Sequence, residues 1–278
     1  MLLTGLAIHP VKSTAIRPVG SARVLLGGLE GDRAWVVVDA DGVMVTAREE
    51  HPLFTIVADT PATDPSVASA LRLRAPEMPD LLLDQPVGDR VRARVFSQEL
   101  EGIPVGLEAD AWVQKSLRRD DLRLLWCDDP TRRTLDPAHS RPEDFTAYAD
   151  GYPVTIASEA SLRQLNDWII EGALERGEDP SAPLPMERFR PNLVVDGDTA
   201  FGEDDWTSVQ VGDVRFRVAK PNARCVITTI DLDSLQTNKE PIRTLARHRL
   251  VDSLTMFATN LIPETTGIVR VGDHVDVS

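Results

Sequence analysis

A Gly-Asp turn signal recurs between short β-rich runs, and it constrains the fold of this chain more than any other feature. The three turns are Val87-Gly88-Asp89, Val211-Gly212-Asp213 and Val271-Gly272-Asp273. Glycine reaches backbone angles that other residues avoid, so such turns typically join neighbouring antiparallel strands. Repeated turns of one type favour meandering sheets that close into barrels. We therefore expect a mainly β protein with peripheral helices, an α+β arrangement that includes a β-barrel in each half.

The clearest single hairpin is predicted near the N-terminus. Ala34–Val38 is typical of a strand, Asp39–Gly42 of a tight turn, and Val43–Thr46 of the returning partner. Arg33 enters this hairpin and Arg48 leaves it, so we expect both cations to project from the same end.

Helices and further strands are predicted from periodicity and capping signals. Glu108–Leu117 places apolar residues on one broad face, and Ser158 is suited to cap a helix that runs through Ile170. Strands are expected at Leu2–Ile8, Leu122–Trp126, Val154–Ala157 and Leu193–Val195.

The chain of 278 residues is long enough for two modest domains. We expect an N-terminal domain over residues 1–127 and a second domain over residues 128–278. Residues 128–150 are rich in Pro, Arg and Asp, which predicts a long loop or a connection. The arginines of this loop, Arg132, Arg133 and Arg141, are expected to be solvated.

Composition narrows the class of function. The net charge of -14 argues against a nucleic-acid partner and makes local clusters of Arg and Lys informative. Only two cysteines occur, too few for a disulfide framework or for a four-cysteine iron–sulfur cluster in this chain. No apolar run is long enough to span a bilayer. We expect a soluble protein of the reducing cytoplasm with no membrane partner.

The stretch from Lys220 to Asp231 carries the strongest chemical signal. Cys225 follows a Pro-Asn turn signal and precedes a β-branched run, so we expect the chain to enter a strand at the cysteine. The neighbouring Arg224 favours the thiolate, which is the form that attacks or binds a soft metal. A packed structural thiol is the alternative, and it is the role expected for Cys127. Asp231 is open to two roles, a proton donor or a turn cap.

Several familiar chemistries have no support in the sequence. There is no glycine-rich phosphate loop, no paired-histidine zinc motif and no cysteine pair at metal-ligand spacing. A second cationic segment precedes the strand at Leu193–Val195, where Arg188 and Arg190 flank a phenylalanine before Pro191-Asn192. Two arginines and an amide on a Pro-fixed backbone are suited to an anion-binding rim.

These segments occur in an order that resembles the MOSC family, molybdenum-cofactor proteins with an N-terminal β-barrel domain followed by the MOSC domain. Within it, the likeness is to the mitochondrial amidoxime-reducing component and its bacterial relatives. The likeness runs over nearly the whole chain. It rests on Pro10–Ser13, Gly31–Trp35, Val45–Arg48, Ser158–Ser161, Phe189–Asn192, Arg224–Asp231 and the Val-Gly-Asp turn near the C-terminus.

The resemblance implies a role for each candidate residue. Cys225 would ligate molybdenum beside the dithiolene of the pterin, because thiolate is a soft ligand. Four cations would meet the anionic cofactor, with Arg224 also favouring the thiolate, and four polar side chains would orient it by hydrogen bonds. The cations are Lys12, Arg33, Arg190 and Arg224, and the polar residues are Ser13, Ser158, Asn192 and Asn222. The cofactor is expected between the two domains.

The activity implied is reduction of an N-hydroxylated small molecule by a molybdenum-dependent oxidoreductase. We expect this chain to lack both the membrane-anchoring N-terminus of the mitochondrial proteins and a cysteine-rich ferredoxin-like extension. Electrons are therefore expected from a separate ferredoxin, flavoprotein or haem protein. The alternative is a non-catalytic module that carries the cofactor, or sulfur on Cys225. Both alternatives predict cofactor binding, and only the oxidoreductase predicts turnover.

Overall fold

The computed structural model describes residues 1–278, and its internal contacts divide the chain into two compact units. The first unit comprises Met1–Leu6, Gly20–Leu26 and Val154–Ser278, and the second comprises Ala7–Val19 and Gly27–Pro153. The domain boundary expected at residue 127 stays a prediction. No helix combines the length and the apolar character that crossing a bilayer requires.

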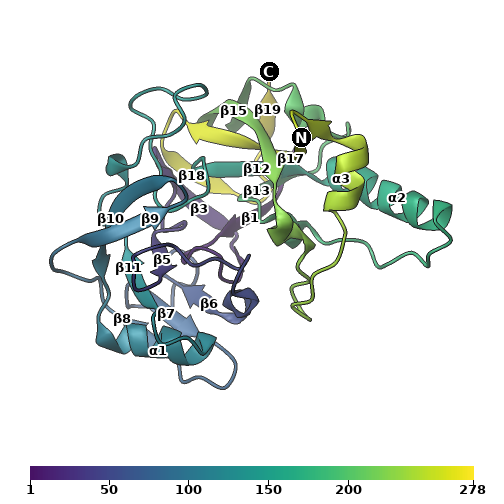
Figure 1. Ribbon diagram of the computed structural model, residues 1–278. Coiled ribbons are helices and arrows are strands. Elements are labelled where there is room, and N and C mark those ends of the chain that lie inside the picture. The colour runs from purple at the N-terminus through teal and green to yellow at the C-terminus, as the bar shows by residue number, and fades with distance from the viewer. The chain divides into compact units, whose positions relative to one another are not determined.

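The first unit is built on a long, mostly antiparallel sheet with the strand order β19-β14-β15-β17-β12-β13-β1, and β16 also pairs with β17 (Figure 1). Only β12 and β13 are parallel neighbours. Its strands are β1 (Leu3–Ile8, which passes into the second unit after Leu6), β3 (Ser21–Leu25), β12 (Val154–Ser158), β13 (Leu193–Val195), β14 (Ser208–Val211), β15 (Val214–Arg224), β16 (Leu250–Val251), β17 (Leu254–Pro263), β18 (Gly267–Arg270) and β19 (Val275–Val277).

Two helices accompany this sheet, α2 (Glu159–Glu175) and α3 (Ile242–His248), and they lie side by side, with α3 against β17 (Figure 1). Three short 3₁₀ turns, η3 (Met186–Phe189), η4 (Gly202–Asp204) and η5 (Val226–Thr229), join the strands. The core between helices and sheet is apolar, and burial of its side chains stabilises the unit. It contains Ala157, Leu165, Ile169, Leu184, Phe189, Leu245, Phe257 and Ala258.

The second unit contains two small antiparallel sheets, with the orders β5-β11-β10-β9 and β6-β7-β8, and one helix, α1 (Leu107–Leu117), that packs on β11 and β8. Val36, Val38, Ala93, Val95, Leu125 and Tyr148 form one buried cluster. The strands are β2 (Arg17–Pro18), β4 (Gly28–Leu29), β5 (Trp35–Val38), β6 (Val57–Asp59), β7 (Leu71–Arg74), β8 (Leu81–Leu83), β9 (Val91–Val95), β10 (Gln98–Pro104) and β11 (Arg123–Trp126), with 3₁₀ turns η1 (His51–Thr55) and η2 (Pro130–Arg132).

The mainly β class with peripheral helices is confirmed, while the sheets are not closed barrels. In the first unit, no ladder joins the outer strands β19 and β1. One isolated bridge, between Leu2 and His274, and backbone hydrogen bonds of Met1 and Leu3 with residues 272–275 link the starts of these two strands without forming a ladder. The expectation of closed barrels therefore gives way to open sheets, since closure needs a continuous ladder between the last strand and the first.

Only one of the three Gly-Asp turns forms a hairpin. Gly212, with a φ of +54°, joins the paired strands β14 and β15. Gly88 and Gly272 also have positive φ, but the strands beside them pair elsewhere, so the expectation that all three join neighbouring strands is wrong. The predicted turn after β5 does require glycine, because Gly42 has a φ of +76° and a Cβ there would lie 2.6 Å from the Arg92 carbonyl oxygen. The strand expected after Gly42 forms only isolated bridges.

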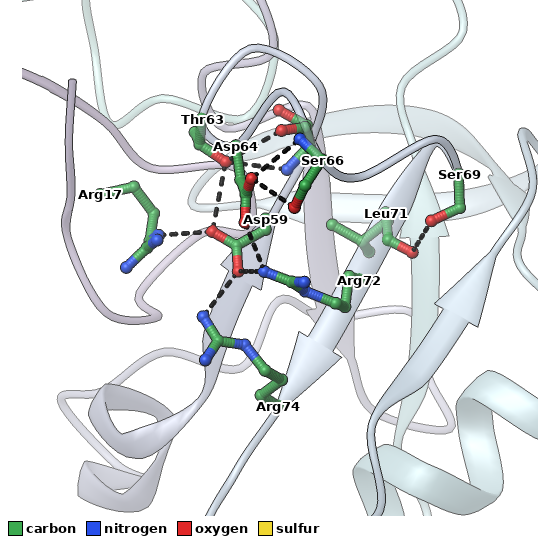
Figure 2. A network of polar contacts seen from close by, with 10 residues as sticks. Arg17, Asp59, Thr63, Asp64, Ser66, Ser69, Leu71, Arg72 and Arg74 are labelled. Atoms are coloured by element: carbon green, nitrogen blue, oxygen red, sulfur yellow. Dashed lines mark hydrogen bonds and ion pairs between the residues drawn. The ribbon is translucent and has the colours of Figure 1, made fainter. Parts of the chain in front are cut away.

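A buried carboxylate organises the sheet β6-β7-β8. Asp59 is fully buried at the end of β6, and three arginines surround it, as Figure 2 shows. Arg17 Nε lies 2.6 Å from one carboxylate oxygen, and the Nη2 atoms of Arg72 and Arg74 lie 2.9 and 2.8 Å from the other. Burial alone would raise the pKa of Asp59, but the hydrogen bonds and charges of these arginines lower it below its ordinary value.

We expect Asp59→Ala to destabilise the protein by about 2–4 kcal/mol, because it leaves three clustered cations without their shared counter-ion. Asp64→Ala is the matched control, since Asp64 is partly exposed and pairs with Arg72 alone among the arginines, and we expect a clearly smaller loss. Urea denaturation of both variants measures the difference. The Asp59 contribution is present at neutral pH and is lost as the pH falls towards its lowered pKa. Equal losses in the two variants would contradict this account.

Candidate functional site

Cys225 lies directly after the end of β15 and immediately before η5, and it is half-buried. The expected order, a loop before the cysteine and a strand after it, is wrong. The Pro-Asn segment is itself part of β15, where Pro221 pairs with Thr259 of β17. Proline is tolerated there because β14 pairs only with residues up to Arg217, which leaves this end of β15 with a free edge.

The β-branched run after Cys225 forms a 3₁₀ turn because its hydroxyls bond to nearby backbone. Thr228 Oγ1 donates to the Cys225 carbonyl at 3.0 Å, and Thr229 Oγ1 donates to the Val226 carbonyl at 2.7 Å. Such local hydrogen bonds from side chain to backbone compete with strand pairing, and the strand propensity of the residues does not predict them. The thiol therefore lies at the end of a strand, where the chain changes direction. A side chain at such a position can contact a ligand.

Two arginines connect η3 with this turn and with the end of β15. Arg188 is buried, and its Nε donates to the Thr228 carbonyl at 2.9 Å while its Nη1 contacts Asp231 at 3.1 Å. Arg224 Nη2 donates to the Phe189 carbonyl at 2.7 Å, and its guanidinium lies over the Phe189 ring. Arg224 thus ties β15 to η3, and its predicted effect on the thiol stays a prediction.

Asp231 has the role of a turn cap. Its Oδ1 accepts hydrogen bonds from the backbone and the hydroxyl of Ser234, which together with Arg188 lower the pKa of its carboxyl. A carboxylate held ionised in this way is a poor proton donor near neutral pH. Of the two roles left open for Asp231, the structure favours the cap.

Thr155 links two of the predicted amide residues. The Thr155 backbone N–H donates to Asn192 Oδ1 at 3.2 Å, and its hydroxyl accepts from Asn222 Nδ2 at 3.2 Å. Arg190 lies between η3 and Asn192, is buried, and has a left-handed φ of 51°. The structure thus assembles four of the predicted cofactor residues around the end of β15: Arg190, Asn192, Asn222 and Arg224.

Ser158 is the exception within the first unit. As expected, it caps α2, because its hydroxyl accepts a hydrogen bond from the Ala160 backbone N–H at 3.1 Å. The helix continues to Glu175, beyond the expected end at Ile170. Ser158 is almost fully buried and is separated from Thr155 along β12. Capping accounts for this residue, and its hydrogen bond to a cofactor stays a prediction.

The remaining predicted residues, Lys12, Ser13 and Arg33, lie in the second unit. Lys12 is buried, and its ammonium donates to the Tyr148 carbonyl at 2.8 Å and pairs with Asp150. Burial lowers the pKa of Lys12 to about 8, although Asp150 opposes the shift. A buried ammonium with one carboxylate partner is suited to a further anion.

Arg33 forms a group of three interacting residues with the buried His9 and Asp32. Asp32 accepts hydrogen bonds from the His9 backbone N–H at 2.7 Å and from the Arg33 guanidinium, and His9 Nδ1 lies 3.2 Å from it. Burial alone would raise the pKa of Asp32, but Arg33 and His9 hold it well below its usual range. No sequence signal connects His9 with Asp32. The predicted hairpin indicated that Arg33 and Arg48 project from the same end of it. The positive charges of both residues lower the pKa of the Asp150 carboxyl.

Three of the predicted residues have left-handed backbone angles, which residues other than glycine usually avoid. The φ values are 69° at Ser13, 47° at Arg33 and 51° at Arg190. Such conformations persist where the surrounding structure enforces them, and they are frequent at functional sites. The strain is an independent reason to treat these positions as candidates.

Arg133 is not solvated, which corrects the expectation for the loop. It is buried, and its Nη1 and Nη2 donate to the carbonyls of Ala147, Ala149 and Asp150. Its Nε donates to Gln98 at 2.8 Å. Arg132, by contrast, pairs with Asp128 near the surface. Backbone carbonyls carry no sequence signal, so composition could not reveal that Arg133 fastens this segment.

The donor set can be compared with the chemistry of a molybdenum pterin. No group of three or more His, Cys, Asp or Glu side chains could hold a metal ion by itself. One half-buried thiol can complete the coordination of a metal that already carries sulfur ligands. The amides and guanidiniums near it match a pterin, and the buried Lys12 matches a phosphate. These residues fit the group that the resemblance implies.

Comparison with known proteins defines the class. The family model described as the MOSC domain matches residues 144–276, and the MOSC N-terminal beta barrel domain matches residues 1–120, so this is a two-part MOSC protein. The chain is 32% identical to mitochondrial amidoxime-reducing component 1 of Xenopus laevis, covering 99% of this chain and 81% of that protein. It is 33% identical to human components 1 and 2, covering 96% of this chain and 80% and 81% of theirs. The chain belongs to the family of the mitochondrial amidoxime-reducing components, which confirms the resemblance.

We expect a thiol-alkylating reagent to modify Cys225 before Cys127. Burial raises the pKa of the Cys127 thiol to about 11, which makes its thiolate about 300-fold scarcer than that of an ordinary thiol. Timed peptide mass spectrometry at pH 7.5, roughly one unit below an ordinary thiol pKa, gives the two rates. Cys225→Ser and Cys127→Ser identify which peptide carries each rate. Labelling of Cys127 as fast as Cys225 would contradict the assignment of Cys127 as a packed structural thiol.

Proposed function

We propose that this protein is a molybdenum-cofactor-dependent oxidoreductase that reduces N-hydroxylated compounds in the cytoplasm. The observation that carries the proposal is the half-buried Cys225 thiol directly after the end of β15, the strand that also carries Asn222 and Arg224. It is supported by the likeness over nearly the full chain to proteins named amidoxime-reducing components.

The proposed reaction is balanced for an amidoxime as the simplest substrate. The N–O bond breaks, two electrons and two protons are taken up, and the amidine and one water molecule leave. The electrons come from a separate ferredoxin, flavoprotein or haem protein. The cofactor supplies the oxygen-accepting and electron-transferring chemistry when it is bound.

The protein contributes ligation, orientation and charge. Cys225 supplies the thiolate that anchors the metal, and β15 with η5 fixes where that sulfur points. Asn192 and Asn222 have their amides set by Thr155, so they present hydrogen bonds at defined positions without reorganisation. Arg190 and Lys12 offer positive charge to the anionic parts of the cofactor.

A non-catalytic carrier of the cofactor remains the competing function. It shares the need for Cys225 and the cation sites, and it differs in requiring no turnover. The assay must therefore measure binding and catalysis in the same preparation.

We expect Cys225→Ala, purified from a cofactor-competent host, to lose bound molybdenum and all benzamidoxime reduction with a chemical electron donor, because the metal loses its protein ligand. Wild type should contain molybdenum and pterin near equal stoichiometry and turn over. Cys127→Ser is the matched control and should keep both properties.

The two functions separate on these data. Molybdenum with pterin but without turnover on any N-hydroxylated substrate would assign the carrier. Wild-type protein without molybdenum, or a Cys225→Ala variant that keeps both metal and turnover, would overturn the proposal.

A further inference from the structure

A cavity of about 460 Å³ opens on the first unit beside the C-terminal part of α2. Its walls come from α2, from the segment between α2 and η3, from Arg188 and Asp231, and from residues next to the start of α3. A volume of this size is ordinary for a small-molecule site. None of the residues assigned to the cofactor lines the cavity, so it is separate from the site described above.

Arg188 lines this cavity with a guanidinium whose donors are not all paired. Its side chain is only 2% exposed. Nε donates to the Thr228 carbonyl and Nη1 contacts Asp231, whereas Nη2 is buried and has no hydrogen-bond partner. Buried polar groups nearly always have a partner. A charged donor left open in a residue that lines a cavity therefore indicates a place for an acceptor.

The other arginines of the cavity are already paired. Arg176 and Arg243 share the carboxylates of Glu178 and Glu240, with N–O distances between 2.7 and 4.0 Å. These four charges neutralise one another and need no ligand. The buried Arg188 is thus the arginine of this cavity that has an open donor.

The wall of the cavity on the side of α2 is apolar. Ile169 and Ala173 are buried and lie four residues apart, so they share one face of α2, and the buried Leu184 also lines the cavity. An apolar wall in the same cavity as a charged donor is suited to a ligand with an apolar body and one anionic group. A small inorganic anion would leave this wall uncovered.

We propose that this cavity binds a small organic carboxylate, with the carboxylate accepting from Arg188 Nη2 and the apolar body lying against the wall of α2. The same guanidinium holds the Thr228 carbonyl, and both the backbone N–H and the hydroxyl of Thr228 donate to the Cys225 carbonyl. A ligand that fixes Arg188 therefore also stabilises the turn that follows Cys225. The site goes beyond the proposed function, because binding requires neither molybdenum nor turnover.

The test is a ligand-observed NMR titration with benzoate and with benzamide, which is a neutral probe of nearly the same shape. We expect wild type to bind benzoate about tenfold or more tightly than benzamide, because only benzoate offers a charged acceptor. Arg188→Lys should reduce this preference to about threefold or less, since an ammonium does not reproduce the planar set of guanidinium donors. Equal binding of the two probes by wild type would overturn the proposal.

Two exposed residues of the cavity test the charge of the ligand without altering the buried turn. Lys239 and Asp179 line the cavity and form no ion pair. We expect Lys239→Gln to weaken benzoate binding and Asp179→Asn to strengthen it, each by about two- to threefold. Lys115→Gln is the matched control, because Lys115 is an exposed residue of α1 and its loss changes the net charge equally. An equal loss in Lys115→Gln, or effects at Lys239 and Asp179 that do not have opposite signs, would overturn the placement of the ligand.

The connection to the turn is tested by hydrogen exchange. The amides of Thr228 and Ile230 are hydrogen-bonded within η5. We expect saturating benzoate to slow exchange of the peptide that contains them by about threefold or more in wild type, and to leave it unchanged in Arg188→Lys. Unchanged exchange in benzoate-saturated wild type would overturn the connection between the cavity and the turn.

The outcome is separable from that of the proposed function. Cys225→Ala should bind benzoate as wild type does, because the thiol takes no part in the cavity. Benzoate binding with these properties supports the site even if the protein reduces no N-hydroxylated compound. Absence of benzoate binding by wild type overturns the site whether or not the protein carries out that reduction.

Discussion

The antiparallel pairing of β15 with β17 is the constraint on which the candidate site depends. β17 is the central strand, since it pairs with β15, β12 and β16. Asn260 of β17 faces Lys220 on one side and Thr155 on the other, so the same ladder sets the positions of both flanking strands. The ladder with β15 ends at Arg224, and the chain turns at Cys225. The location of the thiol thus follows from where the pairing stops.

Buried positive charge is the second constraint, in a chain whose net charge is -14. Isolated charges are costly to bury, so each buried cation needs a partner of opposite charge, a ligand, or several hydrogen-bond acceptors such as the carbonyls around Arg133. Asp59 gathers three arginines into a closed structural network, whereas the partner of Lys12 is an exposed carboxylate. The two clusters differ in the burial of the carboxylate at their centre, because Asp59 is buried and Asp150 is exposed. The buried carboxylate stabilises the fold because it pairs with three cations at once.

The sequence predicted the mainly β class, the α1 and α2 helices, the Ser158 cap and the family, because these depend on local periodicity and on short motifs. It failed at Cys225, where a β-branched run became a 3₁₀ turn through its own threonine hydroxyls. It also missed Arg133, which bonds to backbone carbonyls, and Asp150, whose partner Lys12 lies 138 positions away. Contacts of that kind are made by the folded chain and have no local signal.

The proposed function requires the Cys225 sulfur to be a ligand of the molybdenum. X-ray absorption at the molybdenum edge of the loaded protein, compared between wild type and Cys225→Ser, tests it directly, because serine can coordinate only through oxygen. We expect molybdenum in wild type to have one more sulfur neighbour than the dithiolene provides, and we expect the variant to lose that one neighbour and keep the rest. An unchanged sulfur count in a variant that retains molybdenum would show that Cys225 is not the ligand.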